Sequence, residues 1–488
     1  MNAMNAVRAP AVVVLVAMAV GAAVFGTGPT STPDTGVLPP LHAGVSLTAE
    51  SGDLWFCVGP TVALDGVDER VVTLTSISDE ATDGWVTVIG NLGSEVERAF
   101  RLEPGARLEI RPGPFVPRAT FAGVTVEVPG GRVLVDQRLA GQGSGVGVEV
   151  GPCGTITSDV WQVPWATTAQ PGNRAMLLLY NPFRAPAIAD LRFIGDLGRR
   201  ETLDRQGVVV AGRSISVFDL SERIPDSSVV SATVDVRVGQ VVAARLQIAD
   251  GSGPDGSSGL ALTPGAPEVS PRLFLPGVPS AAGLGSSVVV LNPGDETTEL
   301  EVLVRPAATE VFVEPYRITL RGRQREVVDL GPDRLDGIGP YSIEVRSLDG
   351  VPLAASLVTR PVADGQVADG QEGGPAGLSV LPAVGVGATG WRIRLQGRAD
   401  ATLVVANPGA TTIATVSLST TGAEWPAGVP DRFEIDPAGQ IQVPVGADGL
   451  VLVSASVPVV VVVRRSGPDG RTTALGVAVA GSQARPAP

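Results

Sequence analysis

The sequence predicts an all-β protein in which four tandem immunoglobulin-like antiparallel β-sandwiches follow an N-terminal hydrophobic helix. Three observations lead to this prediction. Short stretches of alternating apolar and polar residues are separated by glycine- and proline-rich turns. One pattern of residues recurs at intervals of 105 to 115 positions. An uncharged apolar stretch opens the chain.

Residues 1–27 are predicted to be a signal peptide or a membrane anchor. Arg8 precedes about 18 uncharged, mostly apolar residues, a length between that of a signal-peptide core and that of a spanning helix. A positive residue on this side predicts a cytoplasmic N-terminus and a body outside the cytoplasm, either membrane-anchored by the helix or secreted. The sequence leaves cleavage open. Residues 28–50, rich in proline and glycine, are predicted to be a linker.

Three apolar strands end in the same Asn-Pro pair, and this pair defines the repeat. The asparagines are Asn181, Asn292 and Asn407, and Ser76 holds the corresponding position in the first unit. Asparagine caps the backbone at the first position of a turn and proline presets the next φ, so each strand is expected to stop there. A glycine in a second shared pattern follows 29 to 32 residues later. The four glycines are Gly105, Gly212, Gly322 and Gly439.

A third shared pattern has two alternating strands around a tight turn, which predicts a hairpin in every unit. Each unit is large enough for its own core, so the units are expected to fold as independent beads. Polar glycine-rich stretches after Ile248 and Val362 indicate either joints between units or long hairpin loops. The predicted β-sandwiches 1 to 4 span residues 51–156, 157–268, 269–383 and 384–483.

The two cysteines lie at opposite ends of the first unit, Cys57 near its start and Cys153 near its end. The first and last strands of such a sandwich can be neighbours. An oxidising exterior would then allow a structural disulfide between them. The alternative is a pair of buried free thiols. No C-x-x-C motif indicates redox activity.

The composition excludes several function classes. The chain has 36 arginines but no lysine, and one histidine, His42. Without lysine there is no P-loop or Schiff-base chemistry, and a single histidine argues against a Ser-His-Asp triad or a zinc protease site. A net charge of −14 without a basic run argues against nucleic acid. We therefore predict no catalytic residue, cofactor or metal site, and the chain is predicted not to be an enzyme.

Some tryptophans follow the repeat and others do not. Trp55 and Trp161 lie 21 and 20 residues before Ser76 and Asn181, nearly the same place in the repeat, as a core residue of each unit would. Phe274 lies close to the same position in the third unit. Trp165 and Trp425 fall outside this phasing. They are therefore the candidate ligand-surface aromatics, able to stack on a sugar.

Taken together, several short motifs resemble an exported actinobacterial family of unknown function. The motifs are W-F-C-x-G from Trp55, P-C at Cys153, N-P-F at Asn181, V-L-N-P-G at Asn292 and R-S-L-x-G-V-P from Arg346. The resemblance spans nearly the whole chain after Glu50. It implies an extracytoplasmic, membrane-tethered β-repeat protein without an assigned activity. It also implies a role in the cell envelope, because genes of this family often lie near those of membrane glycosyltransferases.

The predicted function is that of a non-enzymatic cell-envelope protein outside the cytoplasm, a scaffold or accessory to a membrane glycan-handling partner. Its expected partners are a cell-envelope protein or polysaccharide, and the membrane through the N-terminal helix. The alternative is a protein that binds cell-wall carbohydrate directly. A distant third is a glycoside hydrolase with two carboxylates, the one catalytic chemistry that the composition permits.

Overall fold

The computed structural model describes residues 53–484, apart from 144–145, 201–205, 255, 280–283, 308–310, 332–334, 336–337, 362–376, 397–399, 422–424, 447, 468–469 and 480–482. The predicted N-terminal helix (residues 1–27) and linker (residues 28–50) lie outside the described residues. Within the described residues, no helix has the length and apolar character needed to cross a membrane.

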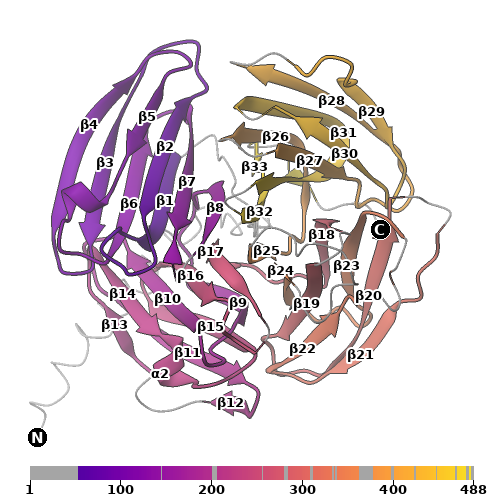
Figure 1. Cartoon of the computed structure of the whole chain (residues 1–488), viewed down its shortest axis with the longest axis horizontal. Helices are drawn as coiled ribbons and strands as arrows, with labels where there is room; N and C mark the ends of the chain where they lie inside the picture. The colour runs from indigo at the N-terminus through magenta and orange to yellow at the C-terminus, as the bar shows by residue number, and fades with distance from the viewer. Residues whose placement is uncertain are drawn as a thin grey trace, which may run out of the picture. The chain divides into compact units, whose positions relative to one another are not determined.

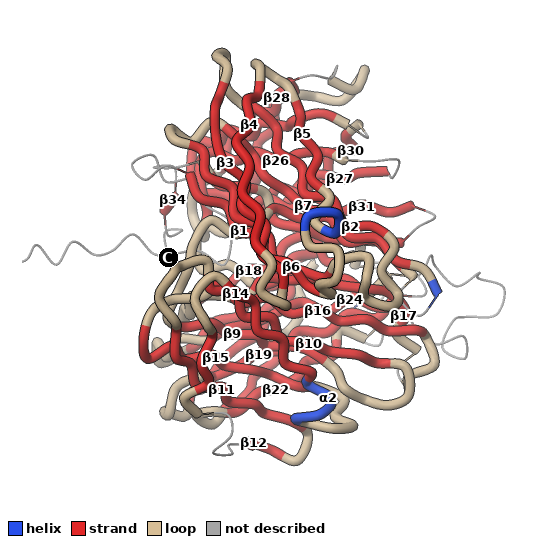
Figure 2. The backbone as a smooth tube through the Cα atoms, turned by 90° about the vertical axis from the view of Figure 1, so that its left-hand side faces the viewer, coloured by secondary structure: helices blue, strands red, loops and turns tan. Residues whose placement is uncertain are grey.

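The described chain consists almost wholly of antiparallel strands, which confirms the predicted all-β class (Figure 2). The helices assigned within the described residues are a 3-10 turn, η1 (Gly113–Phe115), and one short helix, α2 (Leu220–Arg223). The strands form four sheet pairs, numbered 1 to 4 along the chain, and each pair has a first and a second sheet (Figure 1). In pair 4 one long strand runs through both, which joins them into a single nine-stranded sheet.

In sheet pairs 1 and 2 every sheet is built on a path of four strands. The first sheet of pair 1 has the order β1 (Asp53–Pro60), β6 (Phe121–Val128), β3 (Thr82–Gly90), β4 (Glu95–Leu102). Its second sheet has the order β5 (Arg107–Ile110), β2 (Glu69–Ser76), β7 (Val133–Gly141), β8 (Gly147–Pro152). The first sheet of pair 2 has the order β9 (Val160–Ala166), β15 (Val230–Val238), β11 (Ala187–Gly195), β12 (Gly198–Arg200), with β13 (Val208–Val210) also on β11. Its second sheet has the order β14 (Ser214–Asp219), β10 (Asn173–Asn181), β16 (Val242–Asp250), β17 (Ser258–Pro264).

Sheet pairs 3 and 4 repeat this order. The first sheet of pair 3 is β18 (Arg272–Val278), β23 (Tyr341–Ser347), β20 (Thr298–Pro306), β21 (Tyr316–Leu320). Its second sheet is β22 (Gln324–Asp329), β19 (Leu284–Asn292), β24 (Ala354–Pro361), β25 (Ser379–Pro382). The first sheet of pair 4 is β26 (Gly387–Leu395), β31 (Gly449–Gly467), β28 (Ala414–Thr421), β29 (Arg432–Ile435), with β33 (Val477–Ala478) and β34 (Gln483–Ala484) on β26. Its second sheet is β30 (Gln440–Val445), β27 (Asp400–Ala406), the later part of β31, and β32 (Gly470–Leu475).

The strand order differs from that of an immunoglobulin domain. There the first strand lies beside the second, and the seventh beside the sixth. Here the first strand of pair 1, β1, pairs with the sixth strand, β6, and the seventh, β7, pairs with β2. The residues of the first polar glycine-rich stretch, after Ile248, join β16 to β17 within pair 2, so this stretch is a hairpin loop and not a joint.

The predicted hairpins are wrong. The two alternating strands of the third sequence pattern lie in opposite sheets, as β6 and β7 do in pair 1. In pair 4 the corresponding segment is one continuous strand, β31, which pairs first with β26 and then with β27. Alternation and turn residues identify two strands and a turn, but they do not show which strand becomes the hydrogen-bonding partner.

Each sheet pair encloses a core between its two sheets. The tryptophans that follow the repeat are buried there, with Trp55 at 0% and Trp161 at 3% exposure. Phe274 is also buried, at 7% exposure, but it lies on the same face of its sheet as Glu344 and packs against pair 4 instead of the core of pair 3. Trp391, whose role the spacing of the repeat did not predict, occupies the first strand of pair 4 and is also buried. Its indole N–H donates to the Val459 carbonyl, as that of Trp161 donates to Val241.

The sheet pairs are not independent beads, because the first sheet of each pair packs on the second sheet of the next. In β10, the even-numbered Met176, Leu178 and Tyr180 pack against pair 1, while Leu177 and Leu179 face their own core. A strand covered on both faces has a continuous apolar sequence, as β10 does. The buried clusters that join pairs 1 to 2, 2 to 3, 3 to 4 and 4 to 1 contain Phe121 with Tyr180, Trp165 with Val358, Phe274 with Val460, and Leu134 with Leu450.

The Asn-Pro turns form the same hydrogen-bonded bracket in pairs 2, 3 and 4. In pair 3, the side-chain oxygen of Asn292 accepts a hydrogen bond from the Gly294 N–H at 3.1 Å. Its amide nitrogen donates to the Glu296 carbonyl at 2.7 Å and to the Leu320 carbonyl at 3.4 Å. The turn also receives a bond from Arg323 N–H, which follows the repeated glycine Gly322. The spacing of about 30 residues therefore reflects two turns that bind each other.

Replacing Asn292 with alanine is expected to destabilise the protein by about 2 kcal/mol, because buried carbonyl and N–H groups lose their partner. Asn292→Ser introduces the residue that the first unit has at the corresponding position, Ser76, and is expected to lower the stability less than Asn292→Ala. Denaturant unfolding of the two variants checks this. No loss of stability in Asn292→Ala would show that the side-chain hydrogen bonds contribute nothing to the bracket.

Candidate functional site

The last strands of the four sheet pairs meet one another. Glycines at or just before the start of these strands bring the backbones together. A Cβ on Gly147 would lie 3.1 Å from the Leu260 nitrogen, and one on Gly259 would lie 2.6 Å from the Leu378 nitrogen. A Cβ on Gly377 would lie 2.6 Å from the Arg471 nitrogen. Only residues without a side chain fit at these approaches.

A buried charged cluster lies beside these strands. Asp136, Glu149, Arg394 and Arg465 lie between sheet pairs 4 and 1, and Arg245 on β16 of pair 2 acts on Glu149. Arg394 lies 3.8 Å from the Asp136 carboxylate, and both side chains are less than 10% exposed. Neither oxygen of Asp136 accepts a hydrogen bond from the described part of the chain. A cavity of about 20 Å³, room for about one water molecule, is lined by Asp136, Arg394 and Arg465.

The second carboxyl group, Glu149, is hydrogen-bonded to a side chain of pair 4. The Thr472 hydroxyl of β32 donates to its Oε1 at 2.7 Å, and its Oε2 accepts no hydrogen bond within the described residues. Burial raises the pKa of Glu149 to about 8, against the opposing effects of Thr472, Arg245 and Arg465. Burial likewise raises the pKa of Asp136 to about 7, opposed by Arg394, Arg465 and Arg107. The cluster can therefore take up and release protons near neutral pH.

The remaining groups of the cluster are positive and stay charged at neutral pH. Burial lowers the pKa of Arg245 to about 9 and that of Arg465 to about 10. Arg245 lies over the Trp165 ring at 5.0 Å and donates to the Thr263 hydroxyl. Among the described residues, no group of three or more His, Cys, Asp or Glu side chains is placed to hold a metal ion. The chemistry that this cluster supports is proton storage in a packed interface.

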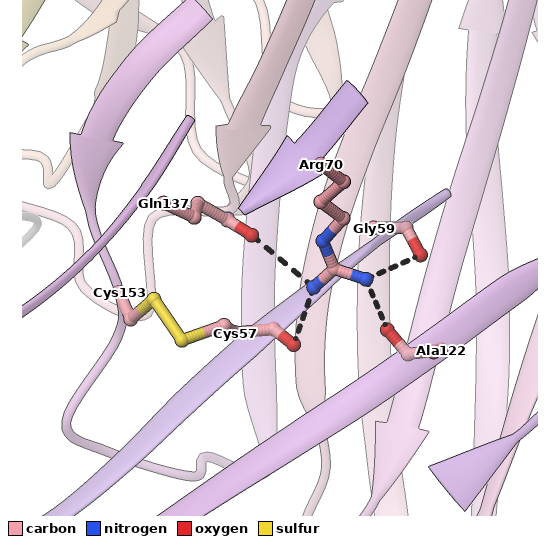
Figure 3. The surroundings of a disulfide bond; sticks show 6 residues. All are labelled: Cys57, Gly59, Arg70, Ala122, Gln137 and Cys153. Atoms are coloured by element: carbon pink, nitrogen blue, oxygen red, sulfur yellow. Dashed lines mark hydrogen bonds between the residues drawn. A yellow bond between two sulfur atoms is a disulfide. The ribbon is translucent and has the colours of Figure 1, made fainter. Parts of the chain in front are cut away.

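The predicted disulfide is present, between Cys57 on β1 and Cys153 directly after β8 (Figure 3). It joins the first sheet of pair 1 to the end of the second sheet, and both residues are buried. Beside it lies the buried Arg70, whose guanidinium donates to the carbonyls of Cys57 at 2.8 Å and Ala122 at 2.8 Å. It also donates to the Gly59 carbonyl and to Gln137. Arg70 therefore binds the backbone of the first sheet from the second.

The structure corrects one of the candidate ligand-surface aromatics. Trp165 is 2% exposed and packs between sheet pairs 2 and 3, so it cannot form a sugar platform. Its position does not match that of the core tryptophans because its side chain contacts sheet pair 3 instead of the core of pair 2. Trp425 is half-buried against the core of pair 4, and its indole N–H donates to the Val429 carbonyl. Trp85 on β3, which the sequence analysis did not single out, is 44% exposed.

Sequence reasoning missed the charged cluster. Asp136 begins a short polar stretch, Asp-Gln-Arg, in the otherwise apolar strand segment VLVDQRL, and Glu149 is the single polar residue of GVEVGP. In an isolated sandwich such positions are read as the solvent-facing side. They are buried here because another sheet pair covers that side. The polar residues within these largely apolar strands were the available indication of a buried charged cluster. They can be interpreted in this way only when the packing of the sheet pairs is known.

Comparison with known proteins places the chain in a family. A search of curated proteins found no match. Among solved structures, the crystal structure of Thermotoga maritima 1070 is similar over 23% of this chain and 92% of that chain, with 18% identity and a TM-score of 0.18. A family model described as a family of unknown function (DUF5719) matches residues 131–436, more than half of the chain. The predicted resemblance to a family of unknown function is confirmed, and the chain belongs to DUF5719.

Proposed function

We propose that this protein is a non-enzymatic scaffold or accessory protein of the cell envelope, outside the cytoplasm, which holds a membrane glycan-handling partner at several points. In this proposal the four sheet pairs are repeats of one β-sandwich whose strand order is not that of an immunoglobulin domain. Their shared strand order and the Asn brackets of pairs 2 to 4 support the repeat.

One observation carries the scaffold proposal. The loop between the third and fourth strands presents an exposed apolar side chain in three sheet pairs. These residues are Leu92 at 68%, Leu197 at 85% and Phe312 at 85% exposure. Single exposed apolar side chains are common on protein surfaces, but these three recur at corresponding places of three sheet pairs, and this recurrence supports a shared role as contact points. Several weak contacts on one rigid body produce strong binding through multivalency.

Cross-linking of intact cells followed by isolation of this protein from washed membranes tests the proposal. The variant Leu92→Ser/Leu197→Ser/Phe312→Ser is expected to lose a membrane glycan-handling protein that the unmodified chain retains. Val238→Ser/Ile413→Ser is the matched control, because these side chains are also exposed but lie at other places. Retention of the same partners by the triple variant would contradict the proposal.

Direct binding of cell-wall carbohydrate is the second candidate function. The exposed Trp85 supports it and is a better candidate for stacking on a sugar than the half-buried Trp425. Recovery of the protein with wall polysaccharide alone, together with loss of that binding in Trp85→Ala, would make it the better explanation. The glycosidase hypothesis gains no support from Asp136 and Glu149, because both lie buried in an interface.

A further inference from the structure

The contact between sheet pairs 4 and 1 completes the cycle of packed sheets without a covalent link. Arg107 on β5 forms a two-oxygen ion pair with Asp448, at 2.9 and 3.0 Å, on the exposed edge of this contact. In the interior, Arg394 on β26 donates to the Thr75 hydroxyl at 2.9 Å, and Thr472 donates to Glu149. These partners are more than 300 positions apart in the sequence. The two sides of this contact are therefore not neighbours in the sequence, and only noncovalent interactions hold them together.

Two buried carboxyl groups lie in this contact, and charged groups of several strands face them. Arg394 on β26, Arg465 on β31 and Arg107 on β5 face Asp136. Glu149 faces Thr472 on β32, Arg465 on β31 and Arg245 on β16. Three of the four carboxyl oxygens accept no hydrogen bond within the described residues. A buried carboxylate with so few partners is costly to ionise, whereas the neutral acid fits the same space.

The contact between sheet pairs 3 and 4 contains a buried carboxyl group of the opposite kind. Glu344 is only 4% exposed in its side chain, but Arg272 and Arg305 pair with its two oxygens at 2.7 and 2.8 Å. Although burial acts to raise it, the pKa of Glu344 is lowered by these two arginines. The ionised form suits that contact. The two contacts are thus expected to respond to pH in opposite directions.

We propose that the contact between sheet pairs 4 and 1 is a pH-sensitive latch, closed while Asp136 and Glu149 hold their protons and weakened when they lose them. Both groups have folded-state pKa values above the ordinary carboxyl range of about 4. The folded protein therefore binds more protons than the unfolded or opened one between about pH 4 and pH 8. The stability of the contact falls as the pH rises through this window. The loss is complete above the folded-state pKa values of the two carboxyl groups.

Hydrogen exchange of the full chain, followed by mass spectrometry, measures the latch directly. After correction for intrinsic exchange rates, amide protection in β8 and β32 is expected to fall about tenfold or more between about pH 6 and pH 9. Protection at the contact between pairs 1 and 2, around Tyr180 on β10, is expected to change little. Equal protection of β8 and β32 at both pH values would overturn the proposal, and this readout requires no variant.

Two variants test whether the carboxyl groups are responsible. Asp136→Asn/Glu149→Gln imitates the protonated state and is expected to keep β8 and β32 protected at both pH values. Glu344→Gln, which removes the well-paired buried carboxylate, is the matched control and is expected to leave the pH dependence of β8 and β32 unchanged. If the double variant opens with rising pH as the unmodified chain does, other groups cause the change and the proposal fails.

Discussion

The variant Cys57→Ala/Cys153→Ala is expected to lose about 4 kcal/mol of stability in sheet pair 1. The disulfide closes a loop with a sequence separation of 96 residues. In the chain-entropy model, a loop of about 100 residues corresponds to a stabilisation of about 4–5 kcal/mol. Since the bond connects both sheets inside a closed core, its loss frees the first strand to separate from the end of the second sheet. The hydrogen bonds of Arg70, the backbone hydrogen bonds between Phe56 and Gly154, and the packed core would then be left to hold the two sheets together.

Denaturant unfolding with and without a thiol reductant measures this effect. Reductant should lower the midpoint of the unmodified protein toward that of the double variant, and it should leave the double variant unchanged. A reductant effect of equal size on both proteins would contradict the assignment, because it could not come from this bond.

The variant Gly259→Ala is expected to cost about 3–5 kcal/mol, as the sum of backbone strain and overpacking. Gly259 has a φ of +139°, a conformation that residues with a side chain rarely adopt, and its added Cβ would lie 2.6 Å from a backbone nitrogen of sheet pair 3. Because the clash is with backbone, no side-chain rotation can relieve it. The contact between pairs 2 and 3 is therefore expected to loosen as well.

Gly198→Ala is the matched control for Gly259→Ala. Gly198 also has a positive φ, +88°, but no atom lies within 4 Å of its added Cβ. Its replacement is expected to cost about 1 kcal/mol, the strain alone. Thermal or denaturant unfolding of both variants separates strain from overpacking. If the two variants lose the same stability, the close approach of the central strands is not under steric constraint.

Features set by local chemistry could be predicted from the sequence. The Asn-Pro turns follow from the capping geometry of asparagine, and the disulfide follows from the two cysteines at the ends of one unit. Trp55 and Trp161 were identified as core residues because their position repeats with the turns. In each case the signal lies in residues close together in the sequence or in a fixed spacing between units.

Features that depend on which strands pair and which sheets pack on each other could not be predicted from the sequence. The strands β6 and β7 look like a hairpin because a tight turn separates them, yet each pairs within a different sheet. Trp165 and Asp136 were misjudged or missed for a related reason. Both lie on sheet faces that are covered only because another sheet pair packs there, and burial between distant segments leaves no period in the sequence.

The closed cycle of sheet contacts has a consequence for how such a gene can vary. In an open array of repeats, adding or losing one copy changes the length but leaves every remaining contact intact. Here the first sheet of pair 4 must meet the second sheet of pair 1. Duplication or deletion of one sheet pair would change the rotation needed to return to the start, as it does for closed assemblies of subunits. Copy number should therefore be constant among relatives that keep this closure, with variation in length confined to loops.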